Sequence, residues 1–152
     1  MSTNEEPSFA VTVTQAAGVW KVAEYDDDFR DVSDAVTAVR RLRAEGPAFA
    51  MLCVEDDYFI IVRPTPGGVK LLISDATAAL DDDFAASALD LINADPEDGE
   101  PYAEGDFDLL ADLGLSEQIV SVIVDDTEAW ASEQLQKIAD EMGFGDELAE
   151  LY

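Results

Sequence analysis

Two consecutive apolar runs decide the fold of this chain: Phe49-Ala50-Met51-Leu52-Cys53-Val54 and Tyr58-Phe59-Ile60-Ile61-Val62-Arg63. Both runs are apolar at nearly every position rather than at every second one. A strand with one face in water alternates apolar and polar residues, whereas a strand covered on both faces is apolar throughout. We therefore expect two central strands in a sheet that carries a layer of helices on each side.

Further strands flank this central pair in the sequence. Residues 9–14 alternate with period two and, after a turn, residues 19–24 complete a β-hairpin. Residues 69–73, Val-Lys-Leu-Leu-Ile, predict a fifth strand that follows the turn at 64–68. The sheet is therefore expected to contain five strands.

Two amphipathic helices are predicted outside the helical C-terminal part. Apolar residues recur at helical spacing from Val32 to Leu42, with Asp31 or Ser33 as the N-cap. A second helix is expected to start in the acidic stretch 81–83, whose charges suit the positive end of the helix dipole. The order of elements is then β-β-α-β-β-β-α.

The last third of the chain predicts helices joined by glycine-containing turns. Residues 107–113 end at Gly114, and a longer helix at 132–142 ends at Gly143, where glycine is favoured as a C-cap. The β-branched stretch Val120–Val124 also fits a strand, but Ser116 as a preceding N-cap favours helix. We expect helix there, with strand as the alternative.

The predicted fold class is α+β, with a five-stranded, mainly antiparallel sheet, helices on both faces and a helical C-terminal part. The first helix is expected on one face and the later helices on the other. The element order resembles longin, roadblock and profilin-like domains, which serve mostly as interaction platforms. The predicted divisions are a disordered tail at 1–8, a sheet domain at 9–93, an acidic loop at 94–105 and a helical part at 106–152 packed on the same domain.

The composition indicates a folded, strongly acidic protein. The 152 residues are 48% apolar, and 8 Lys+Arg against 35 Asp+Glu give a net charge of -27. This charge repels nucleic acid and anionic membranes, which are normally bound through Lys and Arg, and attracts a basic protein surface. We expect a protein partner with a basic surface, and the alternative is that the charge only keeps the protein soluble.

The residue types needed for common catalytic centres are missing. With no histidine and a single cysteine, Cys53, the chain cannot assemble a Ser-His-Asp triad or a Cys/His zinc site. Carboxylate pairs such as Asp106 and Asp108 would suit Mg²⁺ or Ca²⁺, but most clusters lie at predicted turns and helix starts. We expect no catalytic residue, metal or cofactor, and keep a carboxylate-based, metal-dependent enzyme and an acidic nucleic-acid mimic as alternatives.

No targeting or membrane segment is evident in the sequence. No run approaches the roughly 20 apolar residues of a membrane span, and residues 1–7 are polar and acidic rather than basic and then apolar. The lone Cys53 also agrees with a reducing compartment. We therefore expect a cytoplasmic protein.

Several strings of residues carry a family resemblance. They are Gly46-Pro47-Ala48, Tyr58-Phe59-Ile60-Ile61-Val62-Arg63, Leu72-Ile73-Ser74-Asp75-Ala76, Asp106-Phe107-Asp108-Leu109-Leu110-Ala111-Asp112-Leu113-Gly114-Leu115-Ser116 and Gly143-Phe144-Gly145-Asp146-Glu147-Leu148. Together they resemble the tRNA adenosine deaminase-associated proteins of high-G+C Gram-positive bacteria, from about Phe9 onward. The resemblance implies tRNA adenosine deaminase as the partner. The chain itself cannot be that deaminase, whose zinc centre needs a His and a Cys pair.

Candidate contact residues for a partner lie in one motif of the resemblance and among the late aromatic residues. The partner-interface candidates are Ser74, Asp75, Tyr102, Phe107, Trp130 and Phe144. Aromatic residues are enriched at protein interfaces, although at helical spacing they more often belong to a core.

Overall fold

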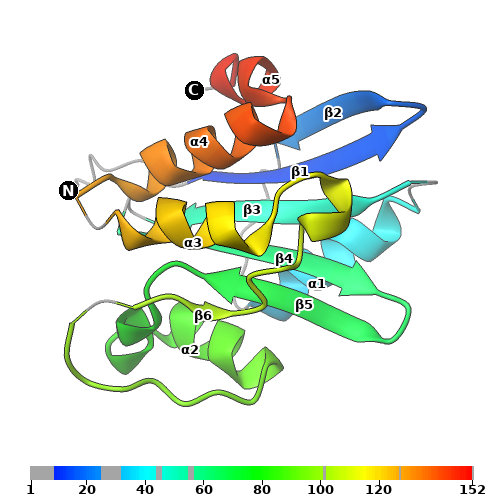
Figure 1. Cartoon of the computed structure of the whole chain (residues 1–152). Helices are drawn as coiled ribbons and strands as arrows, with labels where there is room; N and C mark the ends of the chain where they lie inside the picture. Colours follow the sequence, from blue (N-terminus) through cyan, green and yellow to red (C-terminus); the bar gives the residue numbers. More distant parts are fainter. Residues whose placement is uncertain are drawn as a thin grey trace, which may run out of the picture.

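The computed structural model describes residues 9–24, 32–43, 46–54, 57–100, 102–126 and 128–151. These residues form a fully antiparallel sheet in the order β2-β1-β3-β4-β5-β6 (Figure 1). The strands are β1 (Phe9–Ala16), β2 (Val19–Glu24), β3 (Ala48–Val54), β4 (Tyr58–Thr65), β5 (Gly68–Ile73) and β6 (Glu104–Gly105). The α+β class with a mainly antiparallel sheet is confirmed. The predicted tail at 1–8 lies outside the described residues.

The helices predicted from Val32, from the acidic stretch 81–83, after Ser116 and at 132–142 are present, with short 3₁₀ segments between them. They are α1 (Val32–Arg41), η1 (Ala76–Leu80), α2 (Asp83–Leu91), η2 (Ala111–Leu113), α3 (Glu117–Asp125), α4 (Ala131–Met142) and α5 (Gly145–Ala149). Because α1 begins at Val32, Ser33 lies inside the helix, and the other predicted N-cap, Asp31, lies outside the described residues. The acidic start of α2 is confirmed, since the Asp82 carboxylate accepts a hydrogen bond from the Phe84 N–H at 2.9 Å.

The described sheet has six strands, and the prediction of five was wrong. The sixth strand, β6, has only two residues, Glu104 and Gly105, and lies in the segment predicted as a loop. Gly105 pairs with Leu72, and its φ of 123° is a conformation that favours glycine. Backbone pairing forms this strand without any apolar alternation, so the residue pattern gives no sign of it.

Each face of the sheet carries its own hydrophobic core, which explains the continuous apolar runs. Phe49, Met51 and Cys53 point into a core that they share with α3, α4 and α5. Ala50 and Leu52 point to the opposite face, into a core shared with α1 and α2. Figure 1 shows α3 and α4 in front of the sheet and α1 behind it. Both faces are therefore covered, as the apolar runs predict.

The placement of α2 differs from the prediction. The later helices were expected to share the face opposite the first helix, but α2 packs beside α1. The Val32 N–H donates to Ser87 Oγ at 2.9 Å, and Ala85 and Ala88 are fully buried in the core that α2 shares with α1. Small residues let α2 lie close to its neighbours, and the sequence period alone does not tell which face a helix covers.

The stretch Val120–Val124 is helical, so the strand alternative is excluded. It lies within α3, and Ser116 Oγ accepts a hydrogen bond from the Ile119 N–H at 3.4 Å as the predicted N-cap. Ahead of it, Gly114 takes a left-handed conformation with a φ of 103°. The segment predicted as a helix at 107–113 is instead a turn followed by the short 3₁₀ helix η2.

Candidate functional site

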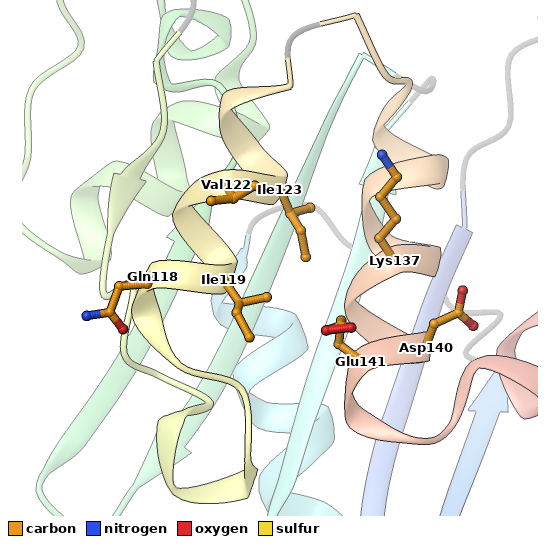
Figure 2. A pocket seen from close by; sticks show the side chains of 7 residues that line it. All are labelled: Gln118, Ile119, Val122, Ile123, Lys137, Asp140 and Glu141. Atoms are coloured by element: carbon orange, nitrogen blue, oxygen red, sulfur yellow. The ribbon is translucent and has the colours of Figure 1, made fainter.

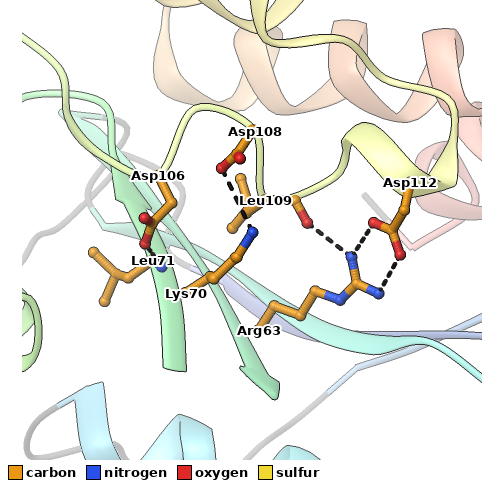
Figure 3. Close-up of polar contacts among 7 residues, drawn as sticks. All are labelled: Arg63, Lys70, Leu71, Asp106, Asp108, Leu109 and Asp112. Carbon is orange, nitrogen blue, oxygen red and sulfur yellow. Dashed lines mark hydrogen bonds and ion pairs between the residues drawn. The ribbon is translucent and has the colours of Figure 1, made fainter. Parts of the chain in front are cut away.

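A partly buried arginine on an interior strand, Arg63 on β4, anchors the segment that follows β6. Its Nη1 donates to the Leu109 carbonyl at 2.8 Å, and its Nη1 and Nη2 donate to the two carboxylate oxygens of Asp112 at 2.6 and 2.9 Å. The Arg63 side chain is only 15% exposed. Figure 3 shows this group, which we call the Arg63 anchor: Arg63, Leu109 and Asp112. A two-pronged contact of this kind fixes orientation as well as distance.

Two neighbouring aspartates reinforce the same connection. The Leu71 N–H donates to Asp106 Oδ2 at 3.0 Å, and the Asp106 N–H donates to the Leu71 carbonyl at 2.7 Å. Lys70 Nζ lies 3.6 Å from Asp108 Oδ1. The pair Asp106 and Asp108, considered for a metal from the sequence, is thus engaged by β5 instead (Figure 3).

The Arg63 anchor also alters the acidity of Asp112. The hydrogen bonds from Arg63 hold the pKa of the Asp112 carboxyl below its ordinary value of 3.8, against a smaller opposing effect of burial. Asp112 is therefore charged whenever the protein is near neutral pH, and its charge is matched by Arg63.

A hollow of about 350 Å³ lies beside the anchor, and most of the residues that line it are polar or charged: Arg63, Thr65, Lys70, Asp108 and Asp112, together with Ala111. Both cations in it already face a carboxylate within 4 Å. An anionic ligand would have to displace these carboxylates and overcome their charge. The charged residues of the hollow therefore stabilise the fold and are poorly suited to bind a phosphate or a carboxylate ligand.

A second, mainly apolar hollow of about 520 Å³ lies between α3 and α4, which we call the α3–α4 groove. It is lined by Gln118, Ile119, Val122, Ile123, Lys137, Asp140 and Glu141. Figure 2 shows Ile119 and Ile123 on the α4 side of α3, with Glu141 on the facing side of α4. Val122 is 71% exposed and Ile119 is 38% exposed. Apolar side chains gathered in one groove are more informative than apolar residues scattered over a surface.

The two helices that form the groove are held together by a buried glutamine. Gln134 on α4 is 6% exposed, and its Nε2 donates to the carbonyl oxygens of Ile123 and Asp126 at 3.1 Å each. These carbonyls belong to the C-terminal end of α3, where a helix lacks internal donors. Lys137 Nζ also lies 3.3 Å from Asp126 Oδ2. The groove is therefore formed by elements with a fixed relative position.

Three of the predicted interface candidates take part in local structure: Ser74 and Asp75, which directly follow β5, and Tyr102, which precedes β6. The Phe59 N–H donates to Ser74 Oγ at 2.9 Å, and Asp75 Oδ1 accepts from the Thr77 N–H at 2.9 Å as the N-cap of η1. The Tyr102 carbonyl accepts from the Ala76 N–H at 2.7 Å. All three side chains are partly buried, so they combine a role in the fold with some access from solvent.

The other candidates differ sharply in exposure. Trp130, at the N-cap of α4, is 57% exposed, whereas Phe107 is partly buried against the core. Phe144 is fully buried, and its ring centroid lies 5.0 Å from that of Trp20 and 6.2 Å from that of Phe49. Phe144 therefore supports the core in this fold, while Trp130 is open to a partner.

Sequence reasoning did not single out the apolar groove residues Ile119 and Val122. Their pattern hid the feature, because β-branched residues at 119, 120 and 122–124 fit a strand as well as a helix. Once α3 is taken as a helix, Val120, Ile123 and Val124 form its core face, and Ile119 and Val122 remain as an apolar surplus. These two apolar residues outside the core face were the one sign in the sequence that α3 has an exposed apolar side.

Metal binding finds no support in the described part of the chain. Among residues 9–24, 32–43, 46–54, 57–100, 102–126 and 128–151, no three or more Asp, Glu, Cys or His side chains are grouped so that they could hold an ion. Within the same ranges, none of the helices has the length and apolar character needed to cross a membrane.

Comparison with known proteins agrees with the resemblance seen in the sequence. Residues 8–145 match the model of the family described as Rv3753c-like tRNA adenosine deaminase-associated protein. The chain belongs to this family. It is 46% identical over 147 residues to Protein Rv3753c of Mycobacterium tuberculosis (strain ATCC 25618 / H37Rv), an alignment that covers 93% of this chain and 85% of that relative.

No solved structure matches the chain. The likeness to longin, roadblock and profilin-like domains therefore stays a prediction from element order alone. The motif Asp106–Ser116, one of the strings that carry the resemblance, has a structural explanation. It contains Asp106 and Asp112, which bind β5 and β4, and Ser116, which caps α3.

Proposed function

We propose that this protein is a non-catalytic, cytoplasmic partner of tRNA adenosine deaminase that binds the enzyme through acidic surface residues. The family description carries the proposal, because it names an association with that enzyme. The charge supports it as well. A net charge of -27 favours a basic partner surface, and an enzyme that binds tRNA needs such a surface to contact the phosphates.

A role in catalysis of its own is disfavoured by residue chemistry. The chain has no histidine, and the zinc centre of a deaminase needs one together with a Cys pair. The sole cysteine, Cys53, is 2% exposed in the middle of β3. The protein is better suited to bind the enzyme and either compete with tRNA or tether the enzyme than to transform a substrate.

The test is direct binding between this protein and the purified tRNA adenosine deaminase of the same organism. We expect a complex in size-exclusion chromatography and calorimetry at low ionic strength, with affinity that falls as salt is added, because exposed charges are screened. An unrelated folded protein of similar size and net charge serves as the control. Absence of a complex at low salt contradicts the proposal, and equal binding by the control favours a general mimic of nucleic acid.

The competing proposal is an enzyme that uses clustered carboxylates and a divalent ion. Thermal melting with increasing Mg²⁺ or Ca²⁺ separates it from the first, because a specific site gives saturable stabilisation beyond the effect of ionic strength. We expect the melting temperature to follow ionic strength alone, as in a matched titration with a monovalent salt.

A further inference from the structure

Helix α3 is apolar on two sides, although one side is enough to cover the sheet. Val120, Ile123 and Val124 are at most 7% exposed and fill the core. Ile119 and Val122 lie three residues apart on another side and are 38% and 71% exposed. A helix that only covers a core is polar on its outer side. The second apolar side therefore calls for a role at the surface.

We infer that the α3–α4 groove binds an amphipathic helix of the partner protein, whose apolar stripe is bordered by Lys or Arg. This inference rests on the proposed function, since it assigns the contact surface for the same partner. Recognition of this kind seats apolar anchors at i, i+3 or i+4 spacing in a groove between secondary-structure elements. Ile119 and Ile123 supply the apolar floor on the α4 side of α3, and Val122 adds an exposed apolar side chain at the edge of the groove (Figure 2).

Charge decides which helix the groove suits. The acids that line it, Asp140 and Glu141, are exposed on α4 (Figure 2). The one cation in the lining, Lys137, lies 3.3 Å from Asp126 and is largely compensated. Apart from Lys137, all charged residues from Glu117 to Glu150 are acidic. A helix with basic borders is therefore attracted to the groove, and an acidic helix is repelled.

The same charge argues against a second copy of this chain as the occupant. Two copies would bring together net charges of -27 each, and like charges at an interface oppose association. A small apolar ligand would find the groove open to water on one side, whereas ligand pockets usually enclose most of the ligand. The partner helix is the occupant that uses both the apolar floor and the acidic border.

The experiment uses the full chain with two substitutions in the groove and a matched control for each. Val122→Gln removes an apolar side chain that is 71% exposed, and Val19→Gln does the same on β2, where Val19 is 67% exposed. Glu141→Lys reverses a charge at the groove, and Glu100→Lys reverses an exposed charge in the loop before β6. Circular dichroism melting verifies that each variant folds.

Two probes report on binding. The first is the purified tRNA adenosine deaminase, and the second is a fluorescent, designed helical peptide with a Leu stripe bordered by Lys. We expect Val122→Gln and Glu141→Lys to weaken the binding of both probes by about tenfold or more, because the first removes an apolar contact and the second reverses a charge at the groove. Val19→Gln should leave affinity unchanged, and Glu100→Lys should weaken it much less than Glu141→Lys.

The outcomes separate the inference from the proposed function. If the deaminase binds and Val122→Gln does not weaken it, the groove assignment is overturned while the proposed partner stands. If the peptide binds in a Val122-dependent way but the deaminase does not bind at all, the groove stands and the proposed partner fails. Equal binding of a peptide with the same residues in scrambled order overturns the inference, as does self-association of this chain that Val122→Gln abolishes.

Discussion

Arg63 and Asp112, which are 49 positions apart in the chain, meet as a two-pronged pair in which each guanidinium Nη donates to one carboxylate oxygen. The distances are 2.6 and 2.9 Å, and Nη1 also donates to the Leu109 carbonyl at 2.8 Å. The pair joins the centre of the sheet to the segment that leads into α3. Its position therefore affects how α3, α4 and α5 are attached to the face of the sheet that they cover.

Replacing Arg63 should loosen this attachment. Arg63→Ala leaves the Leu109 carbonyl and the Asp112 carboxylate without their donor, which should cost about 1–3 kcal/mol of unfolding free energy. Arg63→Lys keeps one charge but loses the fork, so its cost should lie below that of the alanine variant. Urea denaturation measures both values.

Arg41, an exposed residue at the end of α1, provides the matched control. Arg41→Ala removes the same charge from the surface and should change the unfolding free energy by less than about 0.5 kcal/mol. Equal losses for Arg41→Ala and Arg63→Ala would mean that the Arg63 anchor contributes no more than net charge does.

The lowered pKa of Asp112 gives the anchor a pH dependence of known sign. Because the pKa lies below 3.8 in the folded protein and near 3.8 in the unfolded chain, the pair stabilises the fold above pH 3.8. That contribution is lost as the pH falls through the lower, folded value. The Asp112 side chain is 65% exposed, so screening by water keeps the contribution near 0.2–1 kcal/mol, as for other surface pairs.

The measurement compares wild type with Asp112→Asn in urea at neutral pH and at about pH 3. We expect wild type to be the more stable at neutral pH and the difference to shrink in acid. A difference that grows in acid would mean that another group governs the effect.

The short strand β6 depends on a glycine. A Cβ at Gly105 would meet the Leu71 carbonyl oxygen, and the φ of 123° adds strain for any other residue. Gly105→Ala should therefore cost more than about 1–3 kcal/mol, since it combines strain with a clash against backbone. Gly99→Ala is the matched control, because Gly99 also has a positive φ, of 134°, but opens onto empty space. Thermal melting of the two variants should show the larger loss for Gly105→Ala.

Trp130 and Phe144, both predicted as contact residues, should respond to alanine in opposite ways. Phe144→Ala empties a fully buried site between Trp20 and Phe49 and should lower the unfolding free energy by about 3–5 kcal/mol. Trp130→Ala, at a site that is 57% exposed, should change it by about 0.5 kcal/mol or less and weaken binding of the deaminase. Denaturation and calorimetry on the same variants check both parts.

Most of the fold follows from residue patterns, and the exceptions have physical causes. The apolar runs at 49–54 and 58–63 predict a sheet covered on both faces, because water would otherwise require alternation. The strand β6 could not be predicted, since backbone pairing with Leu72 and Ile73 forms it without an apolar pattern. The face chosen by α2 depends on Ser87, Ala85 and Ala88 meeting α1, a contact between distant parts of the chain.

The surface was less predictable than the core. The acidic character, the lack of histidine and the motif Asp106–Ser116 are all visible in the sequence. The roles of the residues in that motif are not, because Arg63 and Leu71, which bind Asp112 and Asp106, lie far from it in the chain. Phe144 was predicted to contact a partner but is buried. Its position between two glycines suggests an exposed turn, and only its ring contact with Trp20 shows that it belongs to the core.

The helices that cover one face of the sheet, α3, α4 and α5, are the last elements to be synthesised. Val11, Phe49 and Met51 are fully buried by α3, α4 and α5, all of which follow residue 116. While the ribosome is still adding these helices, the strands that have already emerged have one face covered by α1 and α2 and one apolar face exposed to water. A chain truncated before α3 should therefore aggregate. Chaperones should bind the nascent chain until its final third has emerged.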